Sequence, residues 1–492
     1  MPANTFSSTT FETRPLALAE QDETIVKGGR HLFDRLADAF EGIRQIGVIG
    51  WSSQGPAQAQ NLRDSLEGTD IKVVVGLREG SSSIPAAEQA GFTRENGTLG
   101  EMYEVIANSD LVLLLIADSA QANEYQKVFE AMKPGATLGL SHGFLVGHLK
   151  NIGASFPEDI NVIGVCPKGM GASVRRLYEQ GADTEGAGIN ASFAVHQDVT
   201  GRALEYALGW SVALGAPFTF QTTLESEYRS DIFGERGILL GAVHGIVELL
   251  YRYFKDHGME GDDAFINSVE SITGPISRTI SHHGIRAVYE SFSDDDRAIF
   301  ERAYSASYHP AFEVLWEIYD EVASGNELRS VVMAAERHKR YPMGKIEGTE
   351  MWRVGHGVRA RRNSIQTPIN PVTAGVYIAT MMAQVDLLRE KGHPYSEIAN
   401  ESIIEAVDSL NPYMHFKGVA FMIDNCSTTA RLGARKWAPR FDYILGQLAI
   451  PTLDEGASPD PAVVQAFRDN SIHEVLGRCA ELRPSVDIAI LE

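Results

Sequence analysis

Residues 46–62 read IGVIGWSSQGPAQAQNL, and this stretch decides the fold of the first part of the chain. Its apolar start predicts a short buried strand, Gly50 permits a tight turn, and Gly55 opens a helix over residues 57–66. Strand, glycine-bearing turn and helix in this order are typical of a dinucleotide-binding unit, in which N–H groups at the helix start hold a pyrophosphate. We therefore expect a nicotinamide cofactor. The alternative is an ordinary strand–turn–helix that happens to contain glycines.

The expected cofactor contacts lie in this turn and after the strands that follow. Ser52 replaces the middle glycine of the usual pattern, where the backbone approaches the phosphates most closely. A second strand, 72–77, leads into REGSSS, and Arg78 with several hydroxyls favours the 2′-phosphate of NADP, although Glu79 argues for NAD and a solvated loop is the alternative. The predicted cofactor-binding residues are Gly50, Trp51, Ser52, Ser53, Gln54, Gly55, Arg78, Ser81, Ser83, Asp118, Gln121 and His142.

Two halves of the chain differ in hydrophobic period. Short apolar runs in the first half alternate with helix-length stretches and predict a doubly wound α/β domain around a buried parallel sheet, over residues 25–222 after an arm at 1–24. Longer helical patterns follow and predict a mainly helical domain over 223–492. The expected strands are 46–49, 73–77, 111–116, 136–140, 162–165 and 192–195, and the clearest expected helices are 233–255, 311–321, 374–390 and 396–410.

Charge and composition exclude several function classes. The 492 residues carry a formal net charge of -22, which disfavours nucleic acid and anionic lipid as partners. Cys166, Cys426 and Cys479 are too few and too scattered for a disulfide framework or a cysteine metal site. No uninterrupted apolar run approaches the ~18 residues that span a bilayer, so we expect no membrane segment.

Two pairs of carboxylates stand out in the helical half. Asp231 and Glu235 are four residues apart, as are Glu401 and Glu405, so each pair lies on one helical face. If the two helices face each other, four carboxylates converge, and such a cluster requires bound cations or strongly raised pKa values. Oxygen ligands favour a hard ion, with Mg²⁺ as the default. A solvated helical face is the alternative for each pair.

Three further residues are candidates from their position. His142 and Lys168 each follow a predicted strand, where a doubly wound sheet places its ligand crevice. A structural histidine and an exposed lysine are the respective alternatives. Ser427 precedes a predicted helix and could be simply its N-cap.

The chain resembles ketol-acid reductoisomerase, also called acetohydroxy-acid isomeroreductase, in its long plant-like form. The resemblance extends from about residue 25 to residue 487, which makes it far more specific than any single motif. It is carried by IGVIGWSSQGPAQAQNLRDSL, LVLLLIADSAQA, LGLSHGFLVGHL, VCPKGMGASVRRLYEQG, SDIFGERGILLGAVHGIVE, NESIIEAVDSLNPYMH and DNCSTTARLGARKWAPRFDYILGQ.

The resemblance implies conversion of 2-acetolactate and 2-aceto-2-hydroxybutyrate to 2,3-dihydroxy acids of branched-chain amino-acid synthesis, with NADPH and two Mg²⁺ ions. The first step is an alkyl migration that needs an alkoxide beside an electrophilic ketone, which two adjacent Mg²⁺ ions can provide. Hydride transfer from NADPH follows. Carried over residue by residue, Asp231 bridges both ions, Glu235 serves one, and Glu401 and Glu405 serve the other directly or through water.

The resemblance also implies roles for the remaining catalytic candidates. Ser427 matches the substrate-contacting serine, His142 the histidine beside the nicotinamide, and Lys168 the lysine of the polar network around the metals. The long form contains a duplicated helical unit, and the echoes Gly258…Asn267 and Gly392…Asn400 are compatible with it. Ser52, where relatives have glycine, departs from the pattern and bears on cofactor affinity alone.

Two other functions fit the residues without the resemblance. One is a metal-independent β-hydroxyacid dehydrogenase with a similar layout, and the other is a non-catalytic NADP-sensing protein. The expected partners are a small acetohydroxy-acid substrate and a second copy of the chain in a homodimer. A bacterial cytoplasm is the expected compartment, with the plastid stroma as the alternative.

Overall fold

The computed structural model describes residues 5–484, and the chain divides into two compact units. Within the described residues, the first comprises 5–228, Leu328–Ala335 and 478–484, and the second comprises Arg229–Glu327 and Glu336–Gly477.

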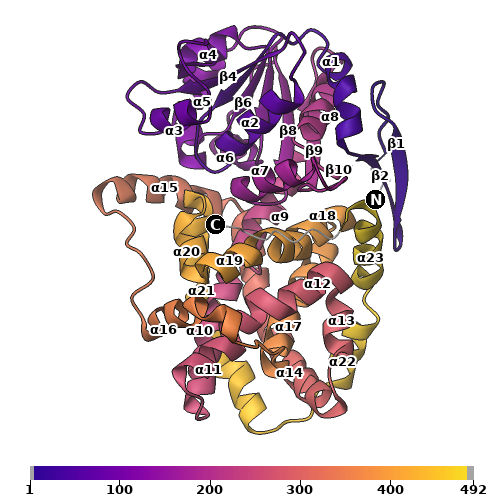
Figure 1. Ribbon diagram of the computed structural model, residues 1–492, viewed down its shortest axis with the longest axis vertical. Coiled ribbons are helices and arrows are strands. Elements are labelled where there is room, and N and C mark those ends of the chain that lie inside the picture. Colours follow the sequence, from indigo (N-terminus) through magenta and orange to yellow (C-terminus); the bar gives the residue numbers. More distant parts are fainter. Residues whose placement is uncertain (1–4, 485–492) are drawn as a thin grey trace. The chain divides into compact units, whose positions relative to one another are not determined.

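The first unit is built on one sheet whose ten described strands have the order β1-β2-β10-β9-β8-β7-β6-β3-β4-β5 (Figure 1). The run from β8 through β3 to β5 is parallel, which gives the doubly wound order of a dinucleotide-binding domain. The strands are β1 Thr13–Leu18, β2 Gln21–Lys27, β3 Gln45–Ile49, β4 Lys72–Leu77, β5 Leu99–Glu101, β6 Leu111–Leu114, β7 Thr137–Leu140, β8 Asn161–Pro167, β9 Ala191–Gln197 and β10 Phe218–Gln221.

Helices cover both faces of this sheet because its strands are apolar on both sides. Ile46 and Val48 of β3 point into a core with α1, α2, α3 and α8, whereas Ile49 points into the opposite core with α4, α5 and α6. The helices of this part of the chain are η1 Arg30–Arg35, α1 Leu36–Ala39, α2 Gly55–Ser65, α3 Ile84–Gln89, α4 Met102–Asn108, α5 Asp118–Ala131, α6 Phe144–Ile152, α7 Gly171–Gln180 and α8 Ala203–Ala213.

The six strands expected from the sequence all form, but the sheet is not wholly parallel. β9 runs antiparallel to β8, with a bulge at Val162/Ile163, and β2 runs antiparallel to β10. β1 and β2 form a hairpin that extends the sheet beyond β10. β1 lies within the predicted arm at residues 1–24, and β2 continues past its end. The apolar content of a strand indicates burial and not direction, so the pattern could not distinguish these pairings.

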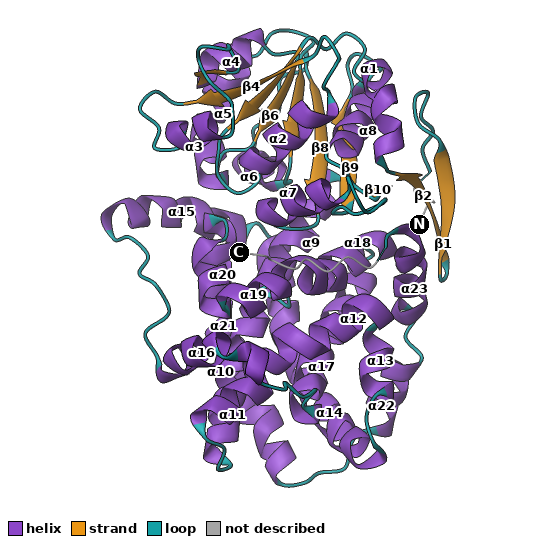
Figure 2. Cartoon of the chain, viewed as in Figure 1, coloured by secondary structure: helices purple, strands orange, loops and turns teal. Residues whose placement is uncertain are grey.

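From Leu224 to Leu482 the regular elements that the structure describes are helices (Figure 2). They are α9 Leu224–Arg236, α10 Gly241–Asp256, α11 Gly261–Phe265, η2 Ile266–Glu270, η3 Ile272–Ile276, α12 Ser277–His283, α13 Ile285–Glu290, α14 Asp294–Ala323, α15 Asn326–Arg340, α16 Glu350–Ala360, η4 Arg362–Ser364, α17 Pro371–Glu390, α18 Tyr395–Ala399, η5 Asn400–Ile404, η6 Ala406–Leu410, α19 Asn411–Lys417, α20 Val419–Asn425, α21 Thr428–Asp454, α22 Pro461–Arg468 and α23 Ile472–Leu482.

The single helix expected over residues 233–255 is in fact two helices. α9 ends at Arg236 and α10 begins at Gly241. A Cβ at Gly241 would lie 2.1 Å from the carbonyl oxygen of Arg236, and a Cβ at Gly237 would lie 2.2 Å from Oε1 of Gln384. The two glycines therefore allow a tight break that the apolar periodicity does not reveal.

The helical unit contains two copies of one helix series, offset by 134 residues. The ends of α11, η2, η3 and α12 recur 134 residues later as the ends of α18, η5, η6 and α19. Gly284 and Gly418 occupy equivalent positions and both have positive φ, at 84° and 106°. Both copies also contain π-helical turns at equivalent places, in η2 and η5. The duplication expected from the family resemblance is confirmed, although the offset pairs Asn267 with Glu401 and not with Asn400.

The two copies are interlocked through their long helices. α10 packs against α21, and α14 packs against α17, so the first long helix of each copy contacts the last long helix of the other. Glycines bring the helices close: a Cβ at Gly245 would lie 2.4 Å from the Ala438 carbonyl oxygen, and a Cβ at Gly375 would lie 2.8 Å from that of Phe300. A helical glycine costs about 0.5–1 kcal/mol relative to alanine, and the close packing it permits offsets this cost.

Two helical stretches, Leu224–Asp256 and Pro371–Glu390, are long and apolar enough to cross a membrane by length and composition. Their most apolar windows are 78% and 83% buried inside the structure. Such burial is typical of the core helices of a folded domain.

Candidate active site

The turn after β3 has the backbone geometry that a dinucleotide loop needs. Gly50 has φ 109°, and a Cβ there would lie 2.8 Å from the Leu115 carbonyl oxygen. A Cβ at Gly55 would lie 2.3 Å from the carbonyl oxygen of Gly50. Both positions therefore require glycine, for the turn and for the close start of α2.

The rest of the loop is anchored to the segment between β8 and α7. Gln54 Nε2 donates a hydrogen bond of 2.9 Å to the Gly169 carbonyl oxygen. A Cβ at Gly171 would lie 1.8 Å from the carbonyl oxygen of Ser53. Ser52 and Ser53 are exposed just before α2. The structure thus leaves these hydroxyls accessible beside the N-terminus of α2, where an anion would be stabilised.

The other predicted cofactor residues follow β4 and β6, the strands on either side of β3. Arg78 is exposed after β4, and Ser81 Oγ accepts a hydrogen bond of 3.2 Å from the Ser83 backbone N–H. Asp118 is the first residue of α5. Gln121 is buried and donates a hydrogen bond of 3.0 Å to the Ile116 carbonyl oxygen, so its amide nitrogen fastens the loop after β6.

His142 and Lys168 are brought together by a residue that the sequence analysis did not single out. His142 Nδ1 lies 3.3 Å from Oε2 of Glu227, and Lys168 Nζ lies 3.3 Å from Oε1 of the same carboxylate. The Gly143 backbone N–H donates a hydrogen bond of 2.6 Å to Oε2. A Cβ at Gly143 would lie 2.0 Å from the Leu224 carbonyl oxygen, so glycine is needed for the turn after β7 to approach α9.

The charge on Glu227 is fixed by these partners. Burial alone would raise the pKa of the Glu227 carboxyl, but Lys168 and His142 outweigh burial and lower its pKa to about 2. Both Glu227 and Lys168 have side chains only 1% exposed. A buried carboxylate therefore holds a buried ammonium and an imidazole in one network.

Three of the four predicted metal ligands converge in the second unit. Asp231 of α9, Glu401 of η5 and Glu405 offer carboxylate oxygens that all lie within 4.8 Å of one another. Glu401 is fully buried, and Asp231 and Glu405 are partly buried. Placing like charges this close in a buried setting is costly unless a cation compensates them, and an all-oxygen donor set fits a hard divalent ion.

The fourth predicted ligand, Glu235, contacts an arginine. Its Oε2 accepts a hydrogen bond of 2.9 Å from Nη1 of Arg236. The thiol of Cys426 is affected by two of these carboxylates. Burial, Glu235 and Glu405 together raise the pKa of the thiol far above its usual value. Ser427 follows Cys426 and is exposed, and its Oγ accepts a hydrogen bond of 3.0 Å from the Ala430 N–H as the N-cap of α21.

A simple signal in the sequence could have found Glu227. It precedes Asp231 by four residues, as Asp231 precedes Glu235, so α9 carries three carboxylates at one spacing. Only the last two were singled out as a pair. Lys168 and Glu227 could not be matched from sequence because their contact spans 59 residues.

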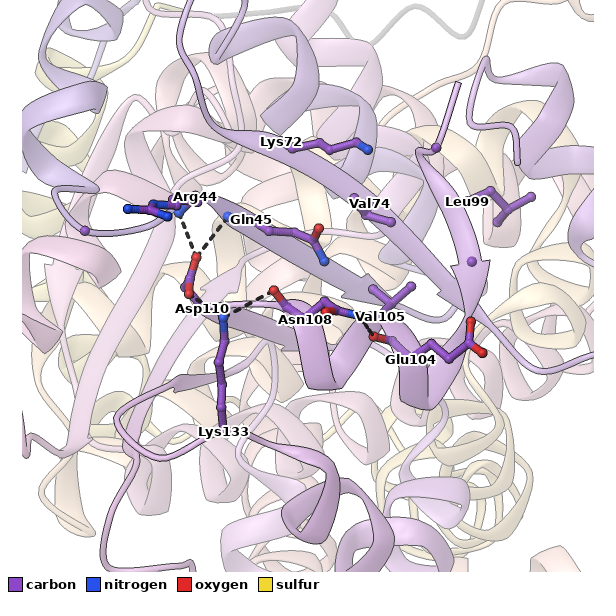
Figure 3. A pocket seen from close by; sticks show the side chains of 13 residues that line it. Arg44, Gln45, Lys72, Val74, Leu99, Glu104, Val105, Asn108, Asp110 and Lys133 are labelled. Atoms are coloured by element: carbon purple, nitrogen blue, oxygen red, sulfur yellow. Dashed lines mark hydrogen bonds and ion pairs between the residues drawn. The ribbon is translucent and has the colours of Figure 1, made fainter. Parts of the chain in front are cut away.

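A cavity of about 670 Å³ lies in the first unit away from these residues (Figure 3). It opens where β3, β4 and β6 begin, the end of the parallel strands opposite to the nucleotide loop. Asp110 Oδ2 accepts hydrogen bonds from the backbone N–H groups of Arg44 and Gln45, and Lys133 Nζ lies 2.6 Å from Asp110 Oδ1. These contacts join the starts of neighbouring strands and thus have a structural role.

Comparisons with known proteins point to one family. Two family models match the chain, "Acetohydroxy acid isomeroreductase, NADPH-binding domain" over residues 42–218 and "Ketol-acid reductoisomerase, C-terminal domain" over residues 224–364. The chain is 60% identical to the chloroplastic ketol-acid reductoisomerase of Spinacia oleracea, covering 99% of this chain and 83% of that protein. It is also 60% identical to the chloroplastic ketol-acid reductoisomerase of Pisum sativum, covering 99% of this chain and 85% of that protein. A solved NADH-preferring ketol-acid reductoisomerase from an uncultured archean aligns with TM-score 0.54 and 26% identity, over 64% of this chain and 94% of that chain.

Proposed function

The chain belongs to the ketol-acid reductoisomerase family, and we propose that it converts 2-acetolactate and 2-aceto-2-hydroxybutyrate to the corresponding 2,3-dihydroxy acids with NADPH and Mg²⁺. The single observation that carries the metal-dependent chemistry is the convergence of Asp231, Glu401 and Glu405. A simple dehydrogenase or a cofactor sensor has no need of such a buried acidic group.

The carboxylates supply the donors that two magnesium ions would use. Asp231, Glu235, Glu401 and Glu405 would together hold the ions. Ions bound there would lower the pKa of the substrate hydroxyl and polarise the neighbouring ketone, which is what an alkyl migration needs. Ser427, exposed at the start of α21, would hold the substrate by its hydroxyl.

The residues of the first unit would serve the reduction. NADPH supplies the hydride, and the loop from Gly50 to Gly55 would hold its pyrophosphate at the start of α2. Glu227 would orient both Lys168 and His142, because each lies 3.3 Å from a different oxygen of its carboxylate. An ordered imidazole and ammonium can hold protons at fixed positions near a reacting oxygen.

The test is NADPH oxidation with 2-acetolactate, measured with and without Mg²⁺. We expect turnover that depends on the metal. Full turnover in EDTA would favour the metal-independent dehydrogenase, and no turnover with Mg²⁺ present would favour the sensing protein. Glu401→Gln should lower kcat strongly and leave the Kd for NADPH within about twofold, because Glu401 belongs to the metal group; a changed Kd with unaltered kcat would contradict that role.

Arg78 is proposed to select NADPH by a charge-assisted bond to the 2′-phosphate. Arg78→Ala should weaken NADPH binding about 10-fold and leave NADH binding almost unchanged, which fluorescence titration with each cofactor measures. Arg94→Ala, at an exposed arginine in the loop before β5, is the matched control and should leave both affinities unchanged. Equal losses for both cofactors would assign Arg78 to the structure of the loop.

The assembly and compartment complete the proposal. We propose a homodimer, which size-exclusion chromatography with light scattering tests directly. Both plant relatives are chloroplastic, so the plastid stroma is the compartment we propose. These relatives give no support to a bacterial cytoplasm.

A further inference from the structure

A fully buried arginine sits directly beside one of the proposed metal ligands. Arg236 ends α9, and its side chain has 0% exposure. Its Nη1 donates a hydrogen bond of 2.9 Å to Oε2 of Glu235, and its Nε donates one of 2.9 Å to Oε2 of Glu327. The guanidinium therefore links a carboxylate of the proposed metal site to a second carboxylate outside it.

Glu327 anchors the other end of this link. It is 1% exposed, and its Oε1 accepts hydrogen bonds from Lys436 Nζ at 2.5 Å and Trp437 Nε1 at 3.1 Å, both on α21. Burial alone would raise the pKa of the Glu327 carboxyl, but Arg236 and Lys436 outweigh it and hold the pKa below its usual value. Glu327 thus stays ionised and fixes Arg236 in one orientation.

α21 is shaped to admit the guanidinium. A Cβ at Gly433 would lie 2.5 Å from Cζ and 2.7 Å from Nε of Arg236, so any side chain at this position would displace the arginine. A helical glycine costs about 0.5–1 kcal/mol relative to alanine. Stability alone gives little reason for the arrangement, because buried ion pairs are often no more stabilising than apolar residues of similar volume.

We propose that Arg236 is a positioning residue for Glu235, which it holds in the orientation that receives a divalent cation; this role rests on the proposed metal-dependent function. The Glu235 side chain is 17% exposed, so without a partner it would lose side-chain entropy on binding an ion. Because Arg236 already restricts the Glu235 side chain before an ion binds, part of this entropy loss no longer accompanies binding. Partners that orient metal ligands typically raise metal affinity on the order of 10–100-fold.

The experiment compares Arg236→Gln with Arg440→Gln in the full-length protein. Arg440 pairs with Glu317 at 2.9 Å on the exposed surface between α21 and α14, so it controls for the loss of an arginine–glutamate pair. Mn²⁺ binding is measured by electron paramagnetic resonance without substrate. We expect Arg236→Gln to weaken Mn²⁺ binding about 10–100-fold, Arg236→Lys to restore part of it, and Arg440→Gln to stay within about twofold.

A double-mutant cycle distinguishes positioning from a merely structural role. If Arg236 acts through Glu235, Arg236→Gln in a Glu235→Gln background should cause no further loss of Mn²⁺ affinity. Additive losses would overturn the role. Wild-type protein that binds no Mn²⁺ would overturn the proposed metal function together with this role, whereas metal binding that Arg236→Gln leaves unchanged would overturn the role of Arg236 alone.

A second variant keeps the test valid if Arg236→Gln fails to fold. Removing Arg236 alone leaves Glu327 buried with fewer cations, and such imbalance is strongly destabilising. Arg236→Gln/Glu327→Gln removes both charges together. We expect this protein to fold, as judged by thermal unfolding, and to show the same loss of Mn²⁺ affinity; wild-type affinity in the folded double variant would refute the proposal.

Discussion

The two helix series of the second unit share a backbone and differ in chemistry. Glu401 and Glu405 in the second series correspond, 134 residues earlier, to Asn267 and Ser271 in the first. The π-helical turns that carry Glu401 and Asn267 have the same bounds relative to each copy, and Glu405 and Ser271 directly follow them. The local fold is therefore compatible with a metal site but does not create one, and two side chains decide the difference.

In the first series the same positions hold the chain instead of a ligand. Ser271 Oγ donates a hydrogen bond of 2.9 Å to the Pro368 carbonyl oxygen and accepts one of 3.0 Å from the Asn370 N–H. Asn267 Oδ1 accepts a hydrogen bond of 3.0 Å from Asn370 Nδ2. These uncharged groups form hydrogen bonds with the segment 368–370, whereas the carboxylates in the second series are grouped with Asp231.

The largest expected effect comes from making the second series like the first. Glu401→Asn with Glu405→Ser should reduce kcat at saturating Mg²⁺ at least about 10³-fold, because the substrate loses the charge stabilisation that the metal site provides. Steady-state NADPH oxidation measures this. In EDTA the melting temperature of the variant should rise, since crowded carboxylates are removed.

The matching control is Ser271→Ala in the first series. It should lower stability by about 1 kcal/mol through its lost hydrogen bonds and leave kcat near that of the wild type. Comparable losses of activity in both series would show that the backbone, and not the carboxylates, carries the function.

A smaller effect is expected from the two N-cap serines, which occupy equivalent positions. Ser293 Oγ accepts a hydrogen bond of 3.2 Å from the Asp296 N–H, as Ser427 Oγ does from Ala430. Ser293→Ala and Ser427→Ala should each destabilise the protein by about 1 kcal/mol, as denaturant unfolding reports. Only Ser427→Ala should raise KM for 2-acetolactate, about 10-fold, because only this hydroxyl is proposed to contact substrate. Equal KM values would leave Ser427 as a cap alone.

A separate effect, on stability at low pH, concerns a buried carboxylate that protein cations neutralise, in contrast to the grouped glutamates of the second series. The folded pKa of Glu227 is about 2, below its usual 4.5, so its stabilisation is present above about pH 4.5 and is lost as the pH falls toward 2. Glu227→Gln should therefore flatten the fall in unfolding free energy over this window. Glu225→Gln, from an exposed pair with Lys150, is the control and should retain the wild-type slope.

Local patterns predicted most of the fold and part of the site. The strand–turn–helix at residues 46–62 and the expected strands depend on short-range periodicity, the duplicated helical unit was implied by resemblance, and the structure contains all three. The carboxylate pairs were visible as spacing, and three of their four residues converge. Strand direction at β9, the break at Gly237, the pairing of Glu227 with Lys168, and the partner Glu327 were not visible, because each depends on contacts between segments far apart in sequence.

The interlocked helices also constrain how the polypeptide can acquire its structure. Arg252 of α10 pairs with Asp442 of α21, 190 residues further along the chain. During synthesis the apolar face of α10 therefore remains exposed until α21 has left the ribosome, when nearly the whole protein has been made. Such high contact order predicts slow folding and a dependence on chaperones, and it predicts that a fragment ending before residue 428 would aggregate instead of forming half an enzyme.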